Sequence, residues 1–128
     1  MTATRIDHSA AFIYINDKGI VWFKFKNNAE ITLEVAREFA GIMEEICDGE
    51  ARRFVFDTRD SYGAAMMESR KYLAHDEHAI RWRKADAILV NSLHNRILAN
   101  FYLKIASNKR PARVFGSEKA ALKWLERF

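Results

Sequence analysis

Short segments with a period of two open the chain. Residues 10–16 and 20–26 are rich in β-branched and aromatic side chains, and apolar residues of the second segment alternate with lysines. This pattern predicts two strands with one buried face. The residues between them, Asn16-Asp17-Lys18-Gly19, tolerate a left-handed backbone, so the two strands are expected to form a hairpin.

The next segment has a helical period. From Val35 to Cys47, apolar residues recur at spacings of three and four, which predicts a helix with one buried stripe. Thr32 offers a hydroxyl that can cap the first turn. Asp48-Gly49 provides the stop, because glycine is favoured where a helix ends in a left-handed turn.

Strands and helices alternate over the rest of the chain. Short apolar runs typical of strands covered on both faces stand at residues 53–57, 85–91 and 112–115. Helical patterns stand between and after them, at residues 66–84, at residues 92–107 and after Ser117. The pattern at 66–84 has few apolar residues, and a break is expected near residues 75–78.

The resulting order, ββαβαβαβα, predicts an α/β fold with a mixed sheet covered by helices. The chain has 128 residues, of which 49% are hydrophobic and 30% charged. This is the size and balance of one ordinary globular domain, so residues 1–128 are expected to form a single domain.

The chain lacks the long apolar runs of an exported or membrane-spanning protein. Residues 1–10 contain no apolar run, which predicts no secretory signal, and nowhere do about 18 consecutive apolar residues occur. Cys47 is the single cysteine and cannot form an internal disulfide. We therefore expect a cytoplasmic protein without a transmembrane segment.

The net charge of +4 is unevenly distributed. Residues 1–64 hold 8 Lys and Arg against 11 Asp and Glu, whereas residues 65–128 hold 13 against 6. A basic patch is predicted from the clustered cations Arg81, Arg83, Lys84, Lys109 and Arg110. Such a patch is explained by simple solvation or by contact with an acidic protein. No aromatic ribonucleoprotein motif, zinc finger or glycine-rich loop supports dedicated nucleic-acid binding.

The residues that could carry chemistry form no catalytic pattern. Asp57 follows a predicted strand, where ligands gather in such sheets, but the other residues of a phospho-accepting receiver site are missing. We expect Asp57 to accept backbone hydrogen bonds instead. His75 and His78 have the spacing of a shared metal site without a third ligand in any motif. With no nucleophile elbow or phosphate-binding loop, the sequence predicts no enzyme, no cofactor and no metal.

Two segments indicate contacts with a partner. Asp60-Ser61-Tyr62-Gly63 is typical of a turn, and alternatively of a regulatory hydroxyl before a helix, where a phosphate would remodel a docking surface. The helix predicted at residues 93–107 has more apolar side chains than one core face needs, among them Leu98 and Tyr102. This surplus indicates either a wide core face or an exposed patch for a protein partner or a second copy of the chain.

The whole chain resembles the STAS superfamily, in particular the SpoIIAA-like anti-sigma-factor antagonists and a group of small bacterial STAS/SEC14-like proteins. The likeness lies in the order of elements, an opening hairpin followed by alternating helices and strands with a closing helix. The segments that carry it are Glu30–Glu34, Arg70–Leu73, Ala87–Ser92, Asn100–Leu103 and Phe115–Leu125. The resemblance implies a single STAS-like domain.

In antagonists of this family, a partner kinase phosphorylates a serine of an Asp-Ser-Ser-Gly motif at the start of the second helix and so switches off binding. Asp60-Ser61-Tyr62-Gly63 is similar to that motif, with Tyr62 in the place of the accepting serine. The resemblance implies regulatory hydroxyl candidates at Ser61, Thr58 and Tyr62. The implied partner surface consists of Asp60, Ser61, Tyr62, Gly63, Leu98 and Tyr102.

These features lead to three hypotheses about function, each from a different class. The leading hypothesis is a non-enzymatic regulatory domain that binds a protein through residues 58–63, the second helix and the exposed side of the helix at 93–107. The alternative, implied by the SEC14 side of the resemblance, is a small apolar or lipid-like ligand between the sheet and the helix at 66–84. A third hypothesis is electrostatic docking of Arg81-Trp82-Arg83-Lys84 on an anionic membrane surface.

Overall fold

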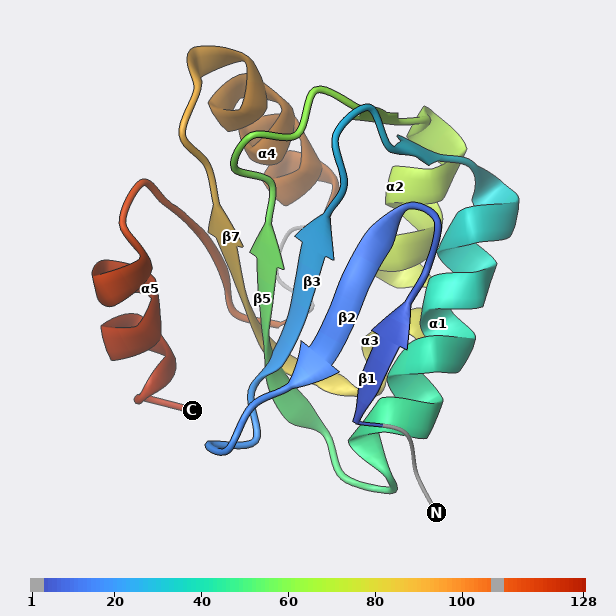
Figure 1. The fold of residues 1–128 in the computed structure, drawn as a ribbon, viewed down its shortest axis with the longest axis vertical. Helices are drawn as coiled ribbons and strands as arrows, with labels where there is room; N and C mark the ends of the chain where they lie inside the picture. The colour runs from blue at the N-terminus through green and yellow to red at the C-terminus, as the bar shows by residue number, and fades with distance from the viewer. Residues whose placement is uncertain (1–3, 107–109) are drawn as a thin grey trace.

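A six-stranded sheet forms the centre of the protein, with the strand order β1-β2-β3-β5-β7-β8. Figure 1 shows it in the computed structural model, which describes residues 4–106 and 110–128. The strands are β1 (Arg5–Asp7), β2 (Ala11–Ile15), β3 (Val21–Phe25), β5 (Arg52–Asp57), β7 (Arg83–Leu89) and β8 (Ala112–Phe115). A separate two-stranded parallel sheet pairs β4 (Glu30–Ile31) with β6 (Ala64–Ala65).

Helices cover both faces of the six-stranded sheet (Figure 1). One face carries α1 (Leu33–Cys47), α2 (Met67–His75), α3 (Glu77–Ile80) and α4 (Leu93–Ala106), and the other carries α5 (Glu118–Leu125). The period of two along each strand separates the faces: Phe54 packs in the cluster with α1, and its neighbour Val55 packs in the cluster with α5. The predicted α/β class with a mixed sheet is therefore confirmed.

The opening hairpin forms where the sequence predicts it. β2 and β3 pair antiparallel, and Gly19 in their connection has a φ of 76°. The Asn16 side-chain oxygen accepts hydrogen bonds from the backbone N–H groups of Lys18 (3.0 Å) and Ile20 (2.9 Å). From β3 onward the central strands run parallel, and their carboxyl ends share one edge of the sheet.

α1 follows its amphipathic pattern closely. Thr32 caps it, with its hydroxyl oxygen accepting from the Val35 N–H at 3.2 Å. Asp48 ends it in the left-handed region at a φ of 51°. The buried residues of α1 are Ala36, Phe39, Ala40, Met43, Ile46 and Cys47.

The predicted helix at residues 66–84 is wrong in its length, although the break expected near residues 75–78 is confirmed. α2 ends at His75, and Asp76 adopts an extended backbone and caps α3 by accepting from the His78 N–H at 2.9 Å. The chain then enters β7 at Arg83, two residues before the predicted strand. This shift reverses the exposure expected for Arg83.

The strands β1, β4 and β6 were not predicted, because segments of two or three residues show no period. The β4–β6 pair accounts for the glycine that ends the Asp60-Ser61-Tyr62-Gly63 segment. A Cβ atom on Gly63 would lie 1.7 Å from the Ala29 carbonyl oxygen, so a larger residue cannot fit without moving the backbone.

Candidate functional site

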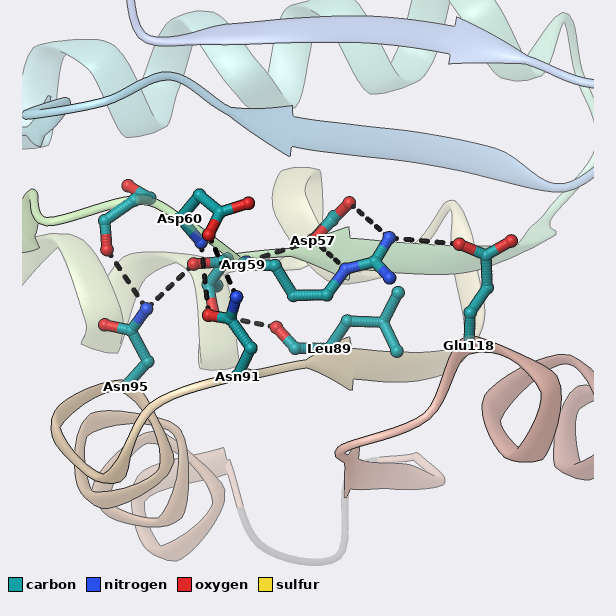
Figure 2. A network of polar contacts seen from close by, with 9 residues as sticks. Asp57, Arg59, Asp60, Leu89, Asn91, Asn95 and Glu118 are labelled. Carbon is teal, nitrogen blue, oxygen red and sulfur yellow. Dashed lines mark hydrogen bonds and ion pairs between the residues drawn. The ribbon is translucent and has the colours of Figure 1, made fainter.

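The loop after β5 is held by a network of charged and amide side chains (Figure 2). The Asp57 carboxylate accepts from the backbone N–H of Arg59 at 3.0 Å, as the sequence predicts, and also pairs with the Arg59 guanidinium. Arg59 continues to Glu118 on α5 at 3.0 Å. Hydrogen bonding to Asp57 raises the pKa of the Arg59 guanidinium above its usual range, so this link stays charged.

Two asparagines also hold this loop through hydrogen bonds, as Figure 2 shows. Asn91 and Asp60 exchange hydrogen bonds of 3.0 and 3.2 Å. Asn95 on α4 donates to the backbone carbonyls of Thr58 (2.8 Å) and Ser61 (3.0 Å). Sequence reasoning did not single out either asparagine, although Asn91 directly follows the apolar run of a strand. The loop is thus a rigid connection between β5, β7 and α4.

The three hydroxyl candidates differ sharply in exposure. Ser61 is buried and its hydroxyl donates to the Lys26 carbonyl at 3.0 Å. The Thr58 hydroxyl donates to the Leu89 carbonyl at 2.7 Å. Tyr62 is 70% exposed. Thr58 is half-buried, so Tyr62 is the most exposed of the three.

A cavity of about 160 Å³ lies between the sheet and the helices α2 and α4, near the carboxyl ends of the parallel strands. Its walls are mainly apolar, with contributions from the sheet, α1, the β4–β6 pair and the loop after β5. The lining residues are Phe25, Ala29, Ile31, Phe39, Phe56, Thr58, Ser61, Gly63, Ala65, Arg70, Leu73, Arg83, Ile88, Asn95, Leu98, Ala99 and Tyr102.

The most deeply buried positions of α2 and α4 carry small or polar side chains, which leaves room for the cavity. The buried residues of α2 are Ser69 and Ala74, and those of α4 are Asn95, Ala99 and Ala106. Side chains of this size do not fill the space between helix and sheet that leucine or phenylalanine would occupy.

A buried ionic cluster stands at one wall of this cavity. Asp86 is fully buried and its carboxylate contacts the guanidinium groups of Arg83 at 3.1 Å and Arg110 at 2.9 Å. Arg83 also donates to the Tyr102 hydroxyl at 2.9 Å. Burial raises the pKa of the Tyr102 phenol, so the hydroxyl stays protonated at neutral pH. Sequence reasoning missed Asp86 because it stands within an apolar run.

Comparison with known proteins places the chain in a family. The family described as "Domain of unknown function (DUF7793)" matches residues 13–128. The chain belongs to the DUF7793 family. No curated protein matches it.

Solved structures also match this DUF7793 domain. One is an uncharacterised DUF3478-family protein with a SpoIIAA-like fold from Shewanella loihica PV-4, 14% identical, with a TM-score of 0.60 over 94% of this chain and 90% of that one. Another is a protein of unknown function from Arthrobacter sp. FB24, 22% identical, with a TM-score of 0.36 over 98% of this chain and 100% of that one. The first match confirms the SpoIIAA-like fold that the sequence resemblance implied.

The basic patch predicted for this DUF7793 domain does not form one surface. Arg83 is buried and 3% exposed, and the Arg110 side chain is 8% exposed, because both guanidinium groups pair with Asp86. Arg81 and Lys84 are exposed, and Lys109 lies outside the described residues. The segment Arg81–Lys84 therefore presents fewer cations to a membrane or an acidic protein than the sequence suggested.

The exposed side of α4 also differs from the prediction. Leu98 and Tyr102 are half-buried and line the cavity. Leu93, Ile97 and Phe101 face solvent instead, at 74%, 47% and 51% exposure. These three residues, spaced by four, form one stripe along the helix, which we call the α4 stripe.

The histidine pair adds no further site. His78 contacts Glu44 at 3.2 Å, and the described residues contain no group of three metal-ligating side chains. Within the same residues, no helix has the length and hydrophobicity needed to cross a membrane.

Proposed function

We propose that this DUF7793 domain is a non-enzymatic binding domain that holds a small, mainly apolar ligand between the sheet and the helices α2 and α4. The observation that carries the proposal is the cavity of about 160 Å³. An apolar protein cavity of about 150 Å³ binds benzene. A ligand body about the size of one aromatic ring therefore matches this space.

The polar groups of the cavity support ligand binding rather than catalysis. Among the described residues that line it, there is no His, Cys, Asp or Glu to act as a base or an activated nucleophile. The hydroxyls of Thr58 and Ser61 already donate to backbone carbonyls. Arg83 is held by Asp86 and Tyr102.

Ligand binding would reach the surface of the domain through the loop after β5. Thr58, Ser61 and Gly63 line the cavity, and the exposed Tyr62 stands among them. A ligand that contacts this loop and α4 from inside favours the conformation in which both are packed on the sheet. Ligand occupancy of the cavity and partner binding at the surface would therefore be coupled through this loop and α4.

Benzene tests the proposal directly. We expect benzene to raise the melting temperature and to shift the NMR signals of Leu73, Leu98 and Ala99. An Ala99→Leu variant fills the cavity and should lose both effects, with Leu98→Phe as a second filling variant. Ile97→Leu, on the outer side of the same helix, should respond like the wild type. An absence of benzene-induced shifts in the wild type would refute the proposal.

A second candidate function is regulatory protein binding through the α4 stripe and Tyr62. Its support is the exposure of three large apolar side chains along one helix face. A photo-crosslinking residue at Ile97, introduced in the native cells, should yield one discrete crosslinked protein. The same residue at the exposed Glu34 of α1 should yield none. Crosslinking that is absent or equal at both positions would remove this candidate.

A further inference from the structure

The cavity wall has an uncompensated positive charge. Two arginines, Arg70 and Arg83, line it, and no carboxylate is found among the lining residues that the structure describes. The ionic cluster beside it does not balance this charge, because the single carboxylate of Asp86 serves both Arg83 and Arg110. A mainly apolar wall with two guanidinium groups and no carboxylate favours a ligand that brings a negative charge.

Arg70 is the arginine that remains available. Its Nε atom is buried without a hydrogen-bond partner among the described residues. It takes part in none of the ion pairs found in that part of the chain. A buried N–H donor without an acceptor carries a free-energy cost that an anionic ligand would remove.

A second donor faces the same space. The Tyr102 hydroxyl accepts from Arg83 at 2.9 Å, which leaves its own proton available for a ligand acceptor. The rest of the wall is aromatic and aliphatic, with Phe25, Phe56 and Leu98 among its members. The polar end of a ligand would thus meet positively charged and neutral donors, and its body would meet carbon atoms.

From this arrangement we propose that the ligand is a small apolar carboxylic acid, with its carboxylate held by Arg70 and its hydrocarbon part in the cavity. The planar guanidinium fork of an arginine matches a carboxylate, which it can bind through two parallel hydrogen bonds. The volume of the cavity suits a hydrocarbon body of about six carbons, the size of benzene. This inference rests on the proposed function and specifies its ligand class.

Three probes of matched length test it: hexanoate, 1-hexanol and hexylammonium, each titrated into the whole protein and followed by NMR. Hexanoate should bind at least about tenfold more tightly than 1-hexanol, since a hydrogen bond to a charged group is worth about that factor. Hexylammonium should bind most weakly, because it adds a positive charge to a wall that already has two.

Arg70→Met keeps most of the side-chain length and removes the charge. It should bind 1-hexanol as the wild type does and lose the preference for hexanoate. Arg81→Met, a change of the same chemistry at an exposed position outside the cavity, should keep that preference. Arg70→Lys serves as a second variant, which retains the charge without the fork and should show an intermediate preference.

The outcomes separate this inference from the proposed function. Equal affinities of the wild type for hexanoate and 1-hexanol would overturn the carboxylate and leave the apolar site in place. A preference for hexanoate that survives in Arg70→Met would overturn the assignment of Arg70. If none of the three probes binds, the proposed function fails together with the inference.

Discussion

The sheet face that carries α1, α2, α3 and α4 has two halves, which differ in how their space is filled. Under α1 the space is filled by large side chains, and Phe39 and Met43 are almost fully buried against Phe23 and Phe54. Under α2 and α4 the most deeply buried side chains are small or polar, and a cavity remains. One sheet thus carries a solid half and a hollow half. Binding should be sought in the hollow half, because the cavity lies there.

The difference has a stability consequence as well. Aromatic side chains in the solid half contact each other directly: the ring centroids of Phe23 and Phe39 lie 5.1 Å apart in an edge-on arrangement. The hollow half depends instead on a buried ionic cluster around Asp86. Packing stabilises the first half, and charge pairing organises the second.

The largest expected effect is the loss of an aromatic ring in the solid half. Phe54→Ala should lower the free energy of unfolding by about 4 kcal/mol, because it leaves a cavity in a tightly packed region. Urea denaturation measures it. The same change at the exposed Phe101 should stay within about 0.5 kcal/mol. Similar losses at the two positions would contradict the division into buried and exposed faces.

A somewhat smaller loss is expected for Asp86→Asn in the hollow half. The amide keeps the volume but leaves two buried guanidinium groups without their counter-ion, at a cost of about 3 kcal/mol. Asp17→Asn, in the exposed turn of the hairpin, is the matched control and should unfold at the wild-type urea concentration. A loss below about 1 kcal/mol for Asp86→Asn would mean that packing alone holds this half.

Leu98→Ala should cost only about 1 kcal/mol, since Leu98 is half-buried beside space that is already empty. Met43→Ala in the solid half provides the contrast, with an expected loss of about 2 to 5 kcal/mol. If Leu98→Ala costs as much as Met43→Ala, the cavity does not exist in solution.

The smallest effect concerns pH and the thiol of Cys47 in the solid half. Burial raises the pKa of Cys47 to about 11, so the folded chain keeps its thiol proton at a pH where the unfolded chain loses it. The unfolded state is therefore favoured as pH rises from the ordinary thiol pKa toward about 11, and stability should fall over that range.

In Cys47→Ala, the part of the stability loss that comes from ionisation of the thiol should be absent. Alkylation of the wild type at pH 8 should also proceed only as fast as the chain opens. Rapid labelling of the folded protein would show that the solid half is open to solvent.

The sequence predicted the solid half well and the hollow half poorly, for identifiable reasons. The stripe of α1 has one apolar face, and the cap and stop around it lie where the residues indicated. α4 is apolar nearly all round, so its period did not distinguish Ile97, which faces solvent, from its neighbour Leu98, which faces the cavity.

The buried position of Arg83 was not predicted because the boundary between the predicted helix and β7 was misplaced. Arg83 and Lys84 were assigned to a helix end, but they belong to β7, where alternate residues face opposite sides. A register shift against β5 beside these two residues interrupts the alternation, so Arg83 is buried on the side of Asp86 and Tyr102, whereas Lys84 is exposed. The cavity itself leaves no signal in a single sequence beyond the few apolar residues of α2, because it arises from what several distant segments fail to fill.

Xenon tests whether the domain is hollow under α2 and α4 and solid under α1. Crystals of the protein pressurised with xenon should show anomalous density between Leu73 and Leu98, since apolar cavities of this size bind xenon. Ala99→Leu crystals should show none there. If xenon is absent from the wild-type cavity, or is found beneath α1, the domain is not divided into a hollow and a solid half.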